Sequence, residues 1–150
     1  MNPRLIAKII GLLLLVSSGM MLPPAVVGMI YQDGDIIPFL EGFLLLALIG
    51  GSLFFTYRHV YAELKIRSGF LVVGSSWIIV GLAGAVPLYA SEYLDLSLID
   101  AIFESVSGLT TTGATILTHI DELPHSVKFY RQQMQWLGGM GIIVLAVAAL

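Results

Sequence analysis

The chain has 150 residues, of which 57% are hydrophobic and 11% are charged, and its mean hydropathy is +0.93. These values exclude an ordinary soluble globular domain and indicate an integral membrane protein. The absence of cysteine excludes disulfides and thiolate metal sites, and a net charge of -3 without a basic patch argues against nucleic-acid binding.

Four apolar runs are candidates for membrane-spanning helices. A bilayer core about 30 Å thick requires roughly 20 apolar residues of helix. Three runs reach this length, at about 5–30, 36–57 and 69–90. A fourth begins near Trp136 and is unbroken at Leu150, which at about 1.5 Å per residue covers only about 22 Å. We therefore expect the 150 residues to stop within the membrane.

The first run has two features that bear on its identity as a span. Arg4 and Lys8 precede an apolar core that reaches the small residues at 17–19, a pattern that also fits a signal peptide. The apolar run continues well past that point, which favours a span. Pro23 and Pro24 interrupt it and are expected to kink or end its outer turn.

The distribution of charge predicts which side of the membrane each loop occupies. One side of the predicted spans holds a cluster of basic residues and a single acid, Glu63. The basic residues are Arg4, Lys8, Arg58, Lys65 and Arg67. The other side carries Lys128, Arg131 and most of the acids, which are Asp33, Asp35, Glu41, Glu92, Asp95, Asp100, Glu104, Asp121 and Glu122. Because short loops rich in lysine and arginine stay in the cytoplasm, we expect a cytoplasmic N-terminus and an acidic outer side.

A short amphipathic helix is predicted between the third and fourth spans. The segment 91–135 begins and ends on the outer side and need not cross the membrane. Ser97 is a candidate N-cap, and Asp100 supplies the negative charge that a helix N-terminus favours. A helix of about ten residues is too short to span the bilayer. Within residues 96–109 the apolar side chains recur at helical spacing, at Leu98, Ile99, Ile102, Phe103 and Val106.

The polar sequence TTTGAT follows this helix at 110–115. A short helix followed by non-helical backbone suggests a re-entrant loop, which membranes tolerate only where protein buries it or it lines a water-filled cavity. The hydroxyls of Thr110, Thr111, Thr112 and Thr115, and backbone carbonyls through Gly113, are oxygen ligands that can replace the hydration shell of an alkali cation. Glycine allows backbone conformations closed to other residues, and the negative end of the preceding helix would attract a cation. The residues alone leave two interpretations open, a cation filter and a threonine-rich outer turn without a ligand.

Longer stretches of the sequence resemble one known family. The segments DAIFESVSGLTTTGAT and LPHSVKFYRQQMQWLGGMGIIVLAVA resemble the first pore loop and the following helix of the Trk/Ktr/HKT potassium transporters. The stretches IIGLLLLVSSGMMLPP, IYQDGD and ELKIRSGFLVV are similar to the TrkH and TrkG subgroup of bacteria. The resemblance covers essentially the whole chain, and its filter and QWLGGMGI motifs are specific.

The resemblance implies an all-α integral membrane protein of the bacterial inner membrane that takes up potassium. Its plan is four repeats of helix, pore loop and helix around a pseudo-fourfold axis, with two extra helices at the N-terminus. Residues 1–68 would then form the N-terminal transmembrane hairpin and a cytoplasmic loop, and residues 69–150 the first repeat, with its last helix incomplete. The implied partners are membrane lipid, the remaining pore repeats, a second copy in a homodimer, and a cytosolic nucleotide-binding regulatory ring called TrkA.

The resemblance also assigns the filter. Thr110, Thr111, Thr112 and Gly113 would supply one quarter of it, with potassium at Thr111 and Thr112. Glycine at the position of Gly113 goes with potassium preference in this family, whereas serine there goes with sodium in some plant relatives. Because the chain supplies one loop of four, we expect no conduction from it alone, and the alternative is a structural or assembly module of the membrane.

Several other residues have both a functional and a structural interpretation. Asp100 and Glu104 share one helix face, which suits acids that concentrate cations at the outer mouth, and equally suits residues that cap and hydrogen-bond the loop. His119 and His125 flank two acids, but their spacing is specific to no metal, and a solvated loop is the alternative. Arg131 is expected at the hydrated start of the fourth span.

Glycines recur on two predicted spans at intervals that favour close helix packing over a gating hinge. They are Gly74, Gly81, Gly84, Gly138, Gly139 and Gly141. An enzyme is not expected, because the threonines have no base placed by a recognisable motif and the sequence holds no phosphate-binding loop.

Overall fold

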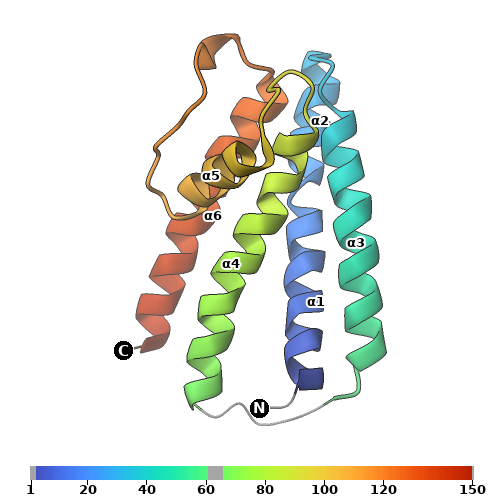
Figure 1. Cartoon of the computed structure of the whole chain (residues 1–150), viewed down its shortest axis with the longest axis vertical. Helices are drawn as coiled ribbons and strands as arrows, with labels where there is room; N and C mark the ends of the chain where they lie inside the picture. Colours follow the sequence, from blue (N-terminus) through green and yellow to red (C-terminus); the bar gives the residue numbers. More distant parts are fainter. Residues whose placement is uncertain (1–2, 61–65, 150) are drawn as a thin grey trace.

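The computed structural model describes residues 3–60 and 66–149, and every regular element in these ranges is a helix (Figure 1). The all-α fold expected from the sequence is therefore confirmed. The inner-loop residues Glu63 and Lys65 lie outside the described residues. In chain order the elements are α1 (Pro3–Gly19), α2 (Leu22–Tyr31), α3 (Ile37–Tyr57), α4 (Ile66–Ala90), α5 (Leu98–Leu109), the short 3-10 helix η1 (Ile120–Glu122) and α6 (His125–Ala149).

The first three predicted spans correspond to helical stretches that are long and apolar enough to cross a membrane. These stretches are Pro3–Tyr31, Ile37–Tyr57 and Val73–Ala90. The first one is broken between α1 and α2. Pro23 and Pro24 stand in the first turn of α2, where a missing N–H removes no helical hydrogen bond. The prolines thus begin a new helix, in addition to interrupting the first.

The prediction that the last helix begins near Trp136 is wrong, because α6 begins at His125. Its first turns are polar in sequence, and two of the polar side chains there have partners inside the protein. The Tyr130 hydroxyl donates to the carbonyl oxygen of Gly84 at 2.9 Å, and Arg131 pairs with Glu104 at 3.3 Å. A search for uninterrupted apolar residues cannot detect such a helix, since its polar groups find partners only in the folded chain.

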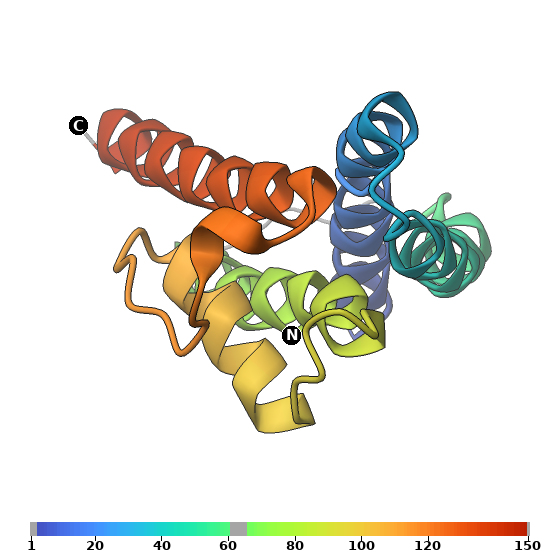
Figure 2. The same cartoon turned by 90° about the horizontal axis from the view of Figure 1, so that it is seen from above.

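The helices form one bundle in which α1 packs against both α3 and α4 (Figures 1 and 2). Helix α5 packs against both α4 and α6. The chain leaves the end of α4, runs inward along α5 and returns to the start of α6 at the same end of the bundle (Figure 1). The chain between α4 and α6 therefore begins and ends at one end of the bundle, and its entry into a membrane stays a prediction.

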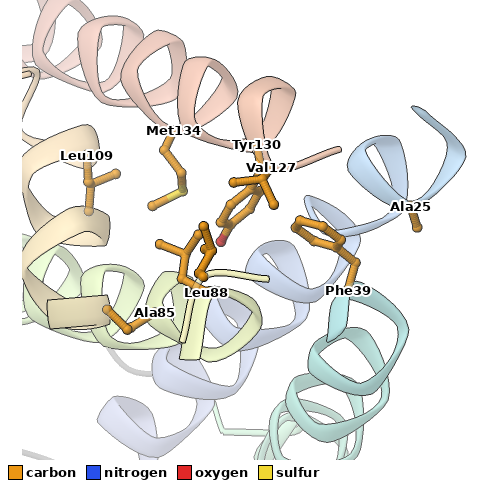
Figure 3. Packing of buried hydrophobic residues seen from close by; sticks show 10 residues of the cluster. Ala25, Phe39, Ala85, Leu88, Leu109, Val127, Tyr130 and Met134 are labelled. Carbon is orange, nitrogen blue, oxygen red and sulfur yellow. The ribbon is translucent and has the colours of Figure 1, made fainter. Parts of the chain in front are cut away.

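The main hydrophobic core joins α2, α3, α4, α5 and α6 (Figure 3). The ring of Phe39 meets that of Tyr130 edge to face, with 5.3 Å between the centroids. Leu88, Leu109 and Met134 complete the contact between α4, α5 and α6. This core fixes α5, and with it the start of the polar loop, against two long helices.

Three of the glycines expected at helix contacts lie at such contacts. A Cβ atom at Gly84 would overlap the Ser105 hydroxyl, and one at Gly138 would overlap the carbonyl oxygen of Leu109. A Cβ at Gly81 would lie 3.0 Å from Val106. Gly74 and Gly139 have no such close neighbour. Close packing is therefore confirmed for the first three positions and has no support at the last two.

The turn between α2 and α3 is bonded to the end of α4 and to the start of α6. Asp33 accepts a hydrogen bond from the backbone N–H of Ser126 at 2.7 Å, which caps the start of α6. The buried Asp35 accepts from the hydroxyl of Ser91, just after α4, at 2.8 Å. Burial raises the pKa of Asp35, the bond from Ser91 opposes this, and the charges of Asp33 and Glu92 add to the increase.

Replacing Asp35 by asparagine is expected to remove one source of pH dependence from the stability of the fold. The pKa of Asp35 in the folded chain lies above the ordinary 3.8. At a pH between 3.8 and the raised pKa, the folded chain therefore binds more protons than the unfolded chain, and the free energy of unfolding falls as the pH rises through this range. The asparagine side chain would keep an oxygen for Ser91 without a charge to bury. The Tm of Asp35→Asn in detergent should exceed that of wild type at about pH 7 and approach it at about pH 4.

Asp33 works in the opposite direction and remains in both proteins. Burial raises its pKa, but hydrogen bonds from Ser126 and Asp35 and the nearby His125 outweigh burial, so its pKa is lowered. Its contribution to stability is present above the ordinary pKa of 3.8 and is lost as pH falls below it. A Tm difference between wild type and Asp35→Asn that stays constant with pH would contradict the prediction.

Candidate functional site

Helix α5 leads into the candidate site and begins as the sequence predicts. The hydroxyl of Ser97 accepts from the backbone N–H of Asp100 at 3.2 Å and donates to the carboxylate of Asp100 at 2.6 Å. This cap satisfies one of the free amides of the first turn. The predicted N-cap is therefore confirmed.

Most of the apolar stripe of α5 is exposed in the described structure, although Ile102 packs against the main core and Val106 lies beside Gly81 of α4. Leu98, Ile99, Phe103 and Val106 are exposed, whereas the opposite face, which includes Glu104 and Ser105, is buried. An open cavity of about 390 Å³ lies between the stripe and the loop. It is lined by Ile99, Ile102, Phe103, Val106, Ser107, Thr110, Thr112 and Ala114.

The loop folds back on the last turn of α5 through its backbone amides. The carbonyl oxygen of Ser107 accepts from the N–H groups of Thr112 at 3.0 Å and Gly113 at 3.4 Å. The N–H of Thr111 donates to Gly108 at 3.0 Å. The last carbonyls of α5 thus hold the loop, so the helix end predicted to face a cation is covered by loop amides.

Two residues of the loop have left-handed backbone conformations. The φ angle is +57° at Thr111 and +73° at Gly113, and Thr112 between them has no positive φ. A positive φ is rare for a β-branched residue and costs of order 1–3 kcal/mol where the structure enforces it. At Gly113 a Cβ would have Gln135 as its nearest neighbour, at 3.8 Å, so glycine is required there by conformation and not by space.

This backbone directs carbonyl groups away from α5. The N–H and C=O of one trans peptide point in opposite directions, and the described peptides are trans. Because the N–H groups of Thr112 and Gly113 point toward Ser107, the carbonyls of Thr111 and Thr112 point away from it. Residues 110–113 are exposed, and their carbonyl oxygens accept no hydrogen bond from any described residue. Two adjacent backbone oxygens are thereby available to a ligand.

The threonine hydroxyls differ in their surroundings. The Thr110 hydroxyl donates to the carbonyl of Val106 at 2.8 Å and lies 2.8 Å from that of Thr112. The Thr115 hydroxyl donates to the carboxylate of Glu104 at 2.6 Å. The hydroxyls of Thr110 and Thr115 therefore hold the loop in place, and the carbonyls are the freer oxygen ligands.

Glu104 is buried under the returning part of the loop. Its Oε1 accepts from the hydroxyl of Thr115 and, at 2.7 Å, from the N–H of Ile116, while its Oε2 pairs with Arg131 at 3.3 Å. The side chains of Glu104 and Arg131 are 2% and 13% exposed. Arg131 is thus not at a hydrated interface as predicted, because it compensates a buried carboxylate.

Sequence reasoning missed the roles of Arg131 and Ser107. An arginine within a helix of a membrane protein signals a partner, because an unpaired charge there is costly. Glu104 lies far from Arg131 in sequence, so the identity of that partner depends on the fold. Ser107 carries no such signal, although its hydroxyl donates to the carbonyl of Ala114 at 2.6 Å and its own carbonyl holds two loop amides.

The two histidines of the outer segment have separate neighbours. The ring of His125 stacks on Tyr31, with 4.2 Å between centroids and 3° between planes. His119 lies 4.0 Å from Glu122. Histidines and acids in the described ranges form no group of three or more that could hold a metal ion.

Comparisons with known proteins identify the family of this chain. The family model of TrkH, a cation transport protein, matches residues 36–150. The chain is 50% identical over 150 residues to the Trk system potassium uptake protein TrkH of Escherichia coli K12, and 39% identical over 147 residues to TrkG of the same strain. It covers 31% of the length of the former and 30% of the latter, so it spans about a third of these relatives.

A solved structure supports the same relationship. The fold matches the crystal structure of the potassium transporter TrkH from Vibrio parahaemolyticus with a TM-score of 0.94 and 49% sequence identity. The match covers 100% of this chain and 32% of the crystallised one. The resemblance seen in the loop and glycine motifs is thus confirmed along the whole chain. The chain belongs to the TrkH family of cation transport proteins, which are transporters and not enzymes.

Proposed function

We propose that this chain supplies one quarter of a potassium-selective filter and that it serves potassium uptake across the bacterial inner membrane. The observation that carries the proposal is the pair of free, exposed carbonyls of Thr111 and Thr112, directed away from α5. Neutral backbone oxygens can replace the hydration shell of potassium. The ion-binding residues are Thr110, Thr111, Thr112 and Gly113, with potassium at Thr111 and Thr112.

Relatives and backbone conformation both support potassium as the ion. The relatives are named potassium uptake proteins. Glycine at position 113, which the resemblance associates with potassium preference, has the positive φ that only glycine adopts readily. The proposal assigns Thr110 to the support of the loop as well as to the filter, since its hydroxyl bonds to α5.

The exposed apolar stripe of α5 supports the proposal that further pore repeats complete the filter. A stripe of large apolar side chains beside the candidate ligands suits contact with another hydrophobic element. On this proposal residues 1–68 form the N-terminal hairpin and cytoplasmic loop, and residues 69–150 the first repeat. A homodimer, surrounding lipid and a TrkA-type regulatory ring in the cytosol complete the assembly.

A cytoplasmic N-terminus is part of the proposal. Lys8 donates to the backbone carbonyls of Arg58 at 2.9 Å and Val60 at 3.0 Å, so these basic residues gather at one end of the bundle. Asp33 and Asp35 lie at the other end, with the starts of α5 and α6. This separation of charge supports the orientation inferred from the positive-inside rule.

A chimera tests the function. In it, this chain replaces the matching 150 residues of the Escherichia coli relative. We expect the chimera to restore growth of a potassium-transport-deficient bacterium at low potassium and to take up rubidium in competition with potassium but not sodium. The relative itself is the positive control, and the empty vector is the negative one. A chimera that reaches the membrane without transporting would favour the alternative, a structural or assembly module.

A second experiment tests whether the chain conducts without its partners. Because it contributes one loop, we expect lipid vesicles that contain it alone to take up no rubidium above the level of empty vesicles. Potassium-selective uptake by such vesicles would contradict the requirement for further repeats, and would imply that several copies assemble into a pore.

A further inference from the structure

One buried carboxylate connects three parts of the repeat. Glu104 belongs to α5, its Oε1 holds Thr115 and Ile116 on the returning loop, and its Oε2 holds Arg131 on α6. The two bonds to Oε1 are short, 2.6 and 2.7 Å, as expected for charge-assisted hydrogen bonds. Glu104 therefore fixes the loop where it leaves the candidate filter.

The two ends of the filter segment are held in different ways. Before the candidate ligands, the carbonyl of Ser107 holds the amides of Thr112 and Gly113. After them, the hydroxyl of Ser107 donates to the carbonyl of Ala114, and Glu104 holds Thr115 and Ile116. A displacement at either end would turn the peptide groups between them, and with them the carbonyls of the filter.

We propose that Glu104 is a positioning residue that sets ion selectivity by fixing the exit of the filter loop, with Arg131 holding its carboxylate. The inference rests on the proposed function, because it requires that the loop binds ions. Both carboxylate oxygens of Glu104 are engaged within the protein, so Glu104 is not among the proposed ion ligands. Its charge is compensated by Arg131, so its role is geometric and differs from that of an acid that attracts cations at the outer mouth.

The surroundings of Glu104 leave little room for another arrangement. The cavity beside it has a volume of about 10 Å³, at the lower limit for one water molecule, and is lined by Ser107, Arg131 and Gln135 among others. A glutamine side chain at this position fits the space and keeps an acceptor for the loop. Its amide group would face the donors of Arg131, leaving a buried guanidinium without its counter-charge.

The test measures selectivity in the chimera. We expect Glu104→Gln to lower the ratio of potassium to sodium uptake by about tenfold, the size expected from loss of one charge-assisted hydrogen bond, with the amount of protein in the membrane unchanged. Arg131→Gln should have a similar effect, and the double variant should lose no more than either single one, since both remove the same pair. Glu92→Gln, which removes an exposed acid from the outer side, is the matched control and should keep the wild-type ratio.

A milder variant keeps the proposal testable where Glu104→Gln fails to fold. Thr115→Val removes, from an exposed residue, the hydroxyl that donates to Glu104 and accepts from the N–H of Leu117 at 3.1 Å, and it leaves the pair with Arg131 intact. It should lower the potassium to sodium uptake ratio about threefold, because it removes one hydrogen bond of the Glu104 carboxylate and leaves its bonds to Ile116 and Arg131 in place. An unchanged ratio in Glu104→Gln would overturn the proposal, and where that variant does not fold, an unchanged ratio in Thr115→Val would overturn it.

Other outcomes separate the competing roles. A fall in apparent potassium affinity that is equal in Glu104→Gln and Asp100→Asn, with selectivity retained, would overturn the proposal in favour of acids at the outer mouth. Uptake that falls only in proportion to the amount of protein in the membrane would also overturn it, since Glu104 would then serve folding alone. Absence of uptake by the unmodified chimera would overturn the proposed function, and this inference with it.

Discussion

Replacement of Gly138 by alanine is expected to separate α5 from α6 and to abolish uptake by the chimera. The new Cβ would overlap the carbonyl oxygen of Leu109, the last residue of α5. The obstacle is backbone, which cannot rotate away as a side chain can, so the two helices must move apart. Such overpacking costs about 1–3 kcal/mol and here also displaces the loop that begins at Thr110.

Gly139→Ala is the matched control for this prediction. It lies on the same helix, and its nearest neighbour would be the methyl group of Thr111 at 3.8 Å, an ordinary contact. Alanine also favours a helix over glycine by about 1 kcal/mol. We therefore expect a lower Tm in detergent and no rubidium uptake for Gly138→Ala, and wild-type values or better for Gly139→Ala. Equal Tm values for the two variants would contradict the close packing of α5 on α6.

Local signals explain which elements could be predicted from the sequence. Helix α5 was predictable because its cap, its first-turn acid and its apolar spacing lie within a few residues of each other. The spans were predictable because the length of an apolar run directly reflects bilayer thickness. The start of α6 could not be predicted, because Tyr130 and Arg131 are typical of a protein surface. Their partners Gly84 and Glu104 are known only from the folded structure.

The face of α5 that is buried could not be predicted from the helix alone. Amphipathic spacing indicates that one face is apolar, and in a soluble domain that face would turn to the core. In this chain the polar face, with Glu104 and Ser105, is buried, and the stripe with Ile99 and Phe103 is exposed. The buried face also holds the apolar Ala101 and Leu109, so it combines core packing with the hydrogen-bonding groups that support the polar loop.

The position of the candidate filter could be predicted from its composition, but the groups that are available to bind an ion could not. Threonine and glycine at 110–113 indicate oxygen ligands, yet nothing in their sequence distinguishes hydroxyls from carbonyls as the available groups. The distinction follows from the amides of Thr112 and Gly113, whose bonds to Ser107 turn the adjoining carbonyls outward. Asp33 and Asp35 illustrate the same limit, because their partners Ser126 and Ser91 are remote in sequence.

Substitution of Gly113 is expected to have the largest effect on selectivity. Its φ of +73° is disfavoured for any residue with a Cβ, by roughly 1–2 kcal/mol, although the Cβ itself would have space. Serine or alanine at this position should therefore turn the peptide groups of the loop and move the carbonyl of Thr112. We expect the potassium to sodium uptake ratio of the chimera to fall about tenfold or more in Gly113→Ser, since 1.4 kcal/mol corresponds to a factor of about ten.

A series at this position separates conformation from side-chain chemistry. Asparagine tolerates a positive φ better than serine or alanine, so Gly113→Asn should retain more selectivity than either if the backbone conformation is what matters. Gly113→Ala and Gly113→Ser should then have similar potassium to sodium uptake ratios. A lower ratio in the serine variant alone would show that the serine hydroxyl causes the effect. Gly74→Ser controls for the substitution itself, because a Cβ at that helical glycine would meet nothing within 4 Å. Unchanged potassium selectivity in Gly113→Ser would remove Gly113 from the filter, and would shift the search for ligands to the hydroxyl of Thr112 and the cavity beside α5.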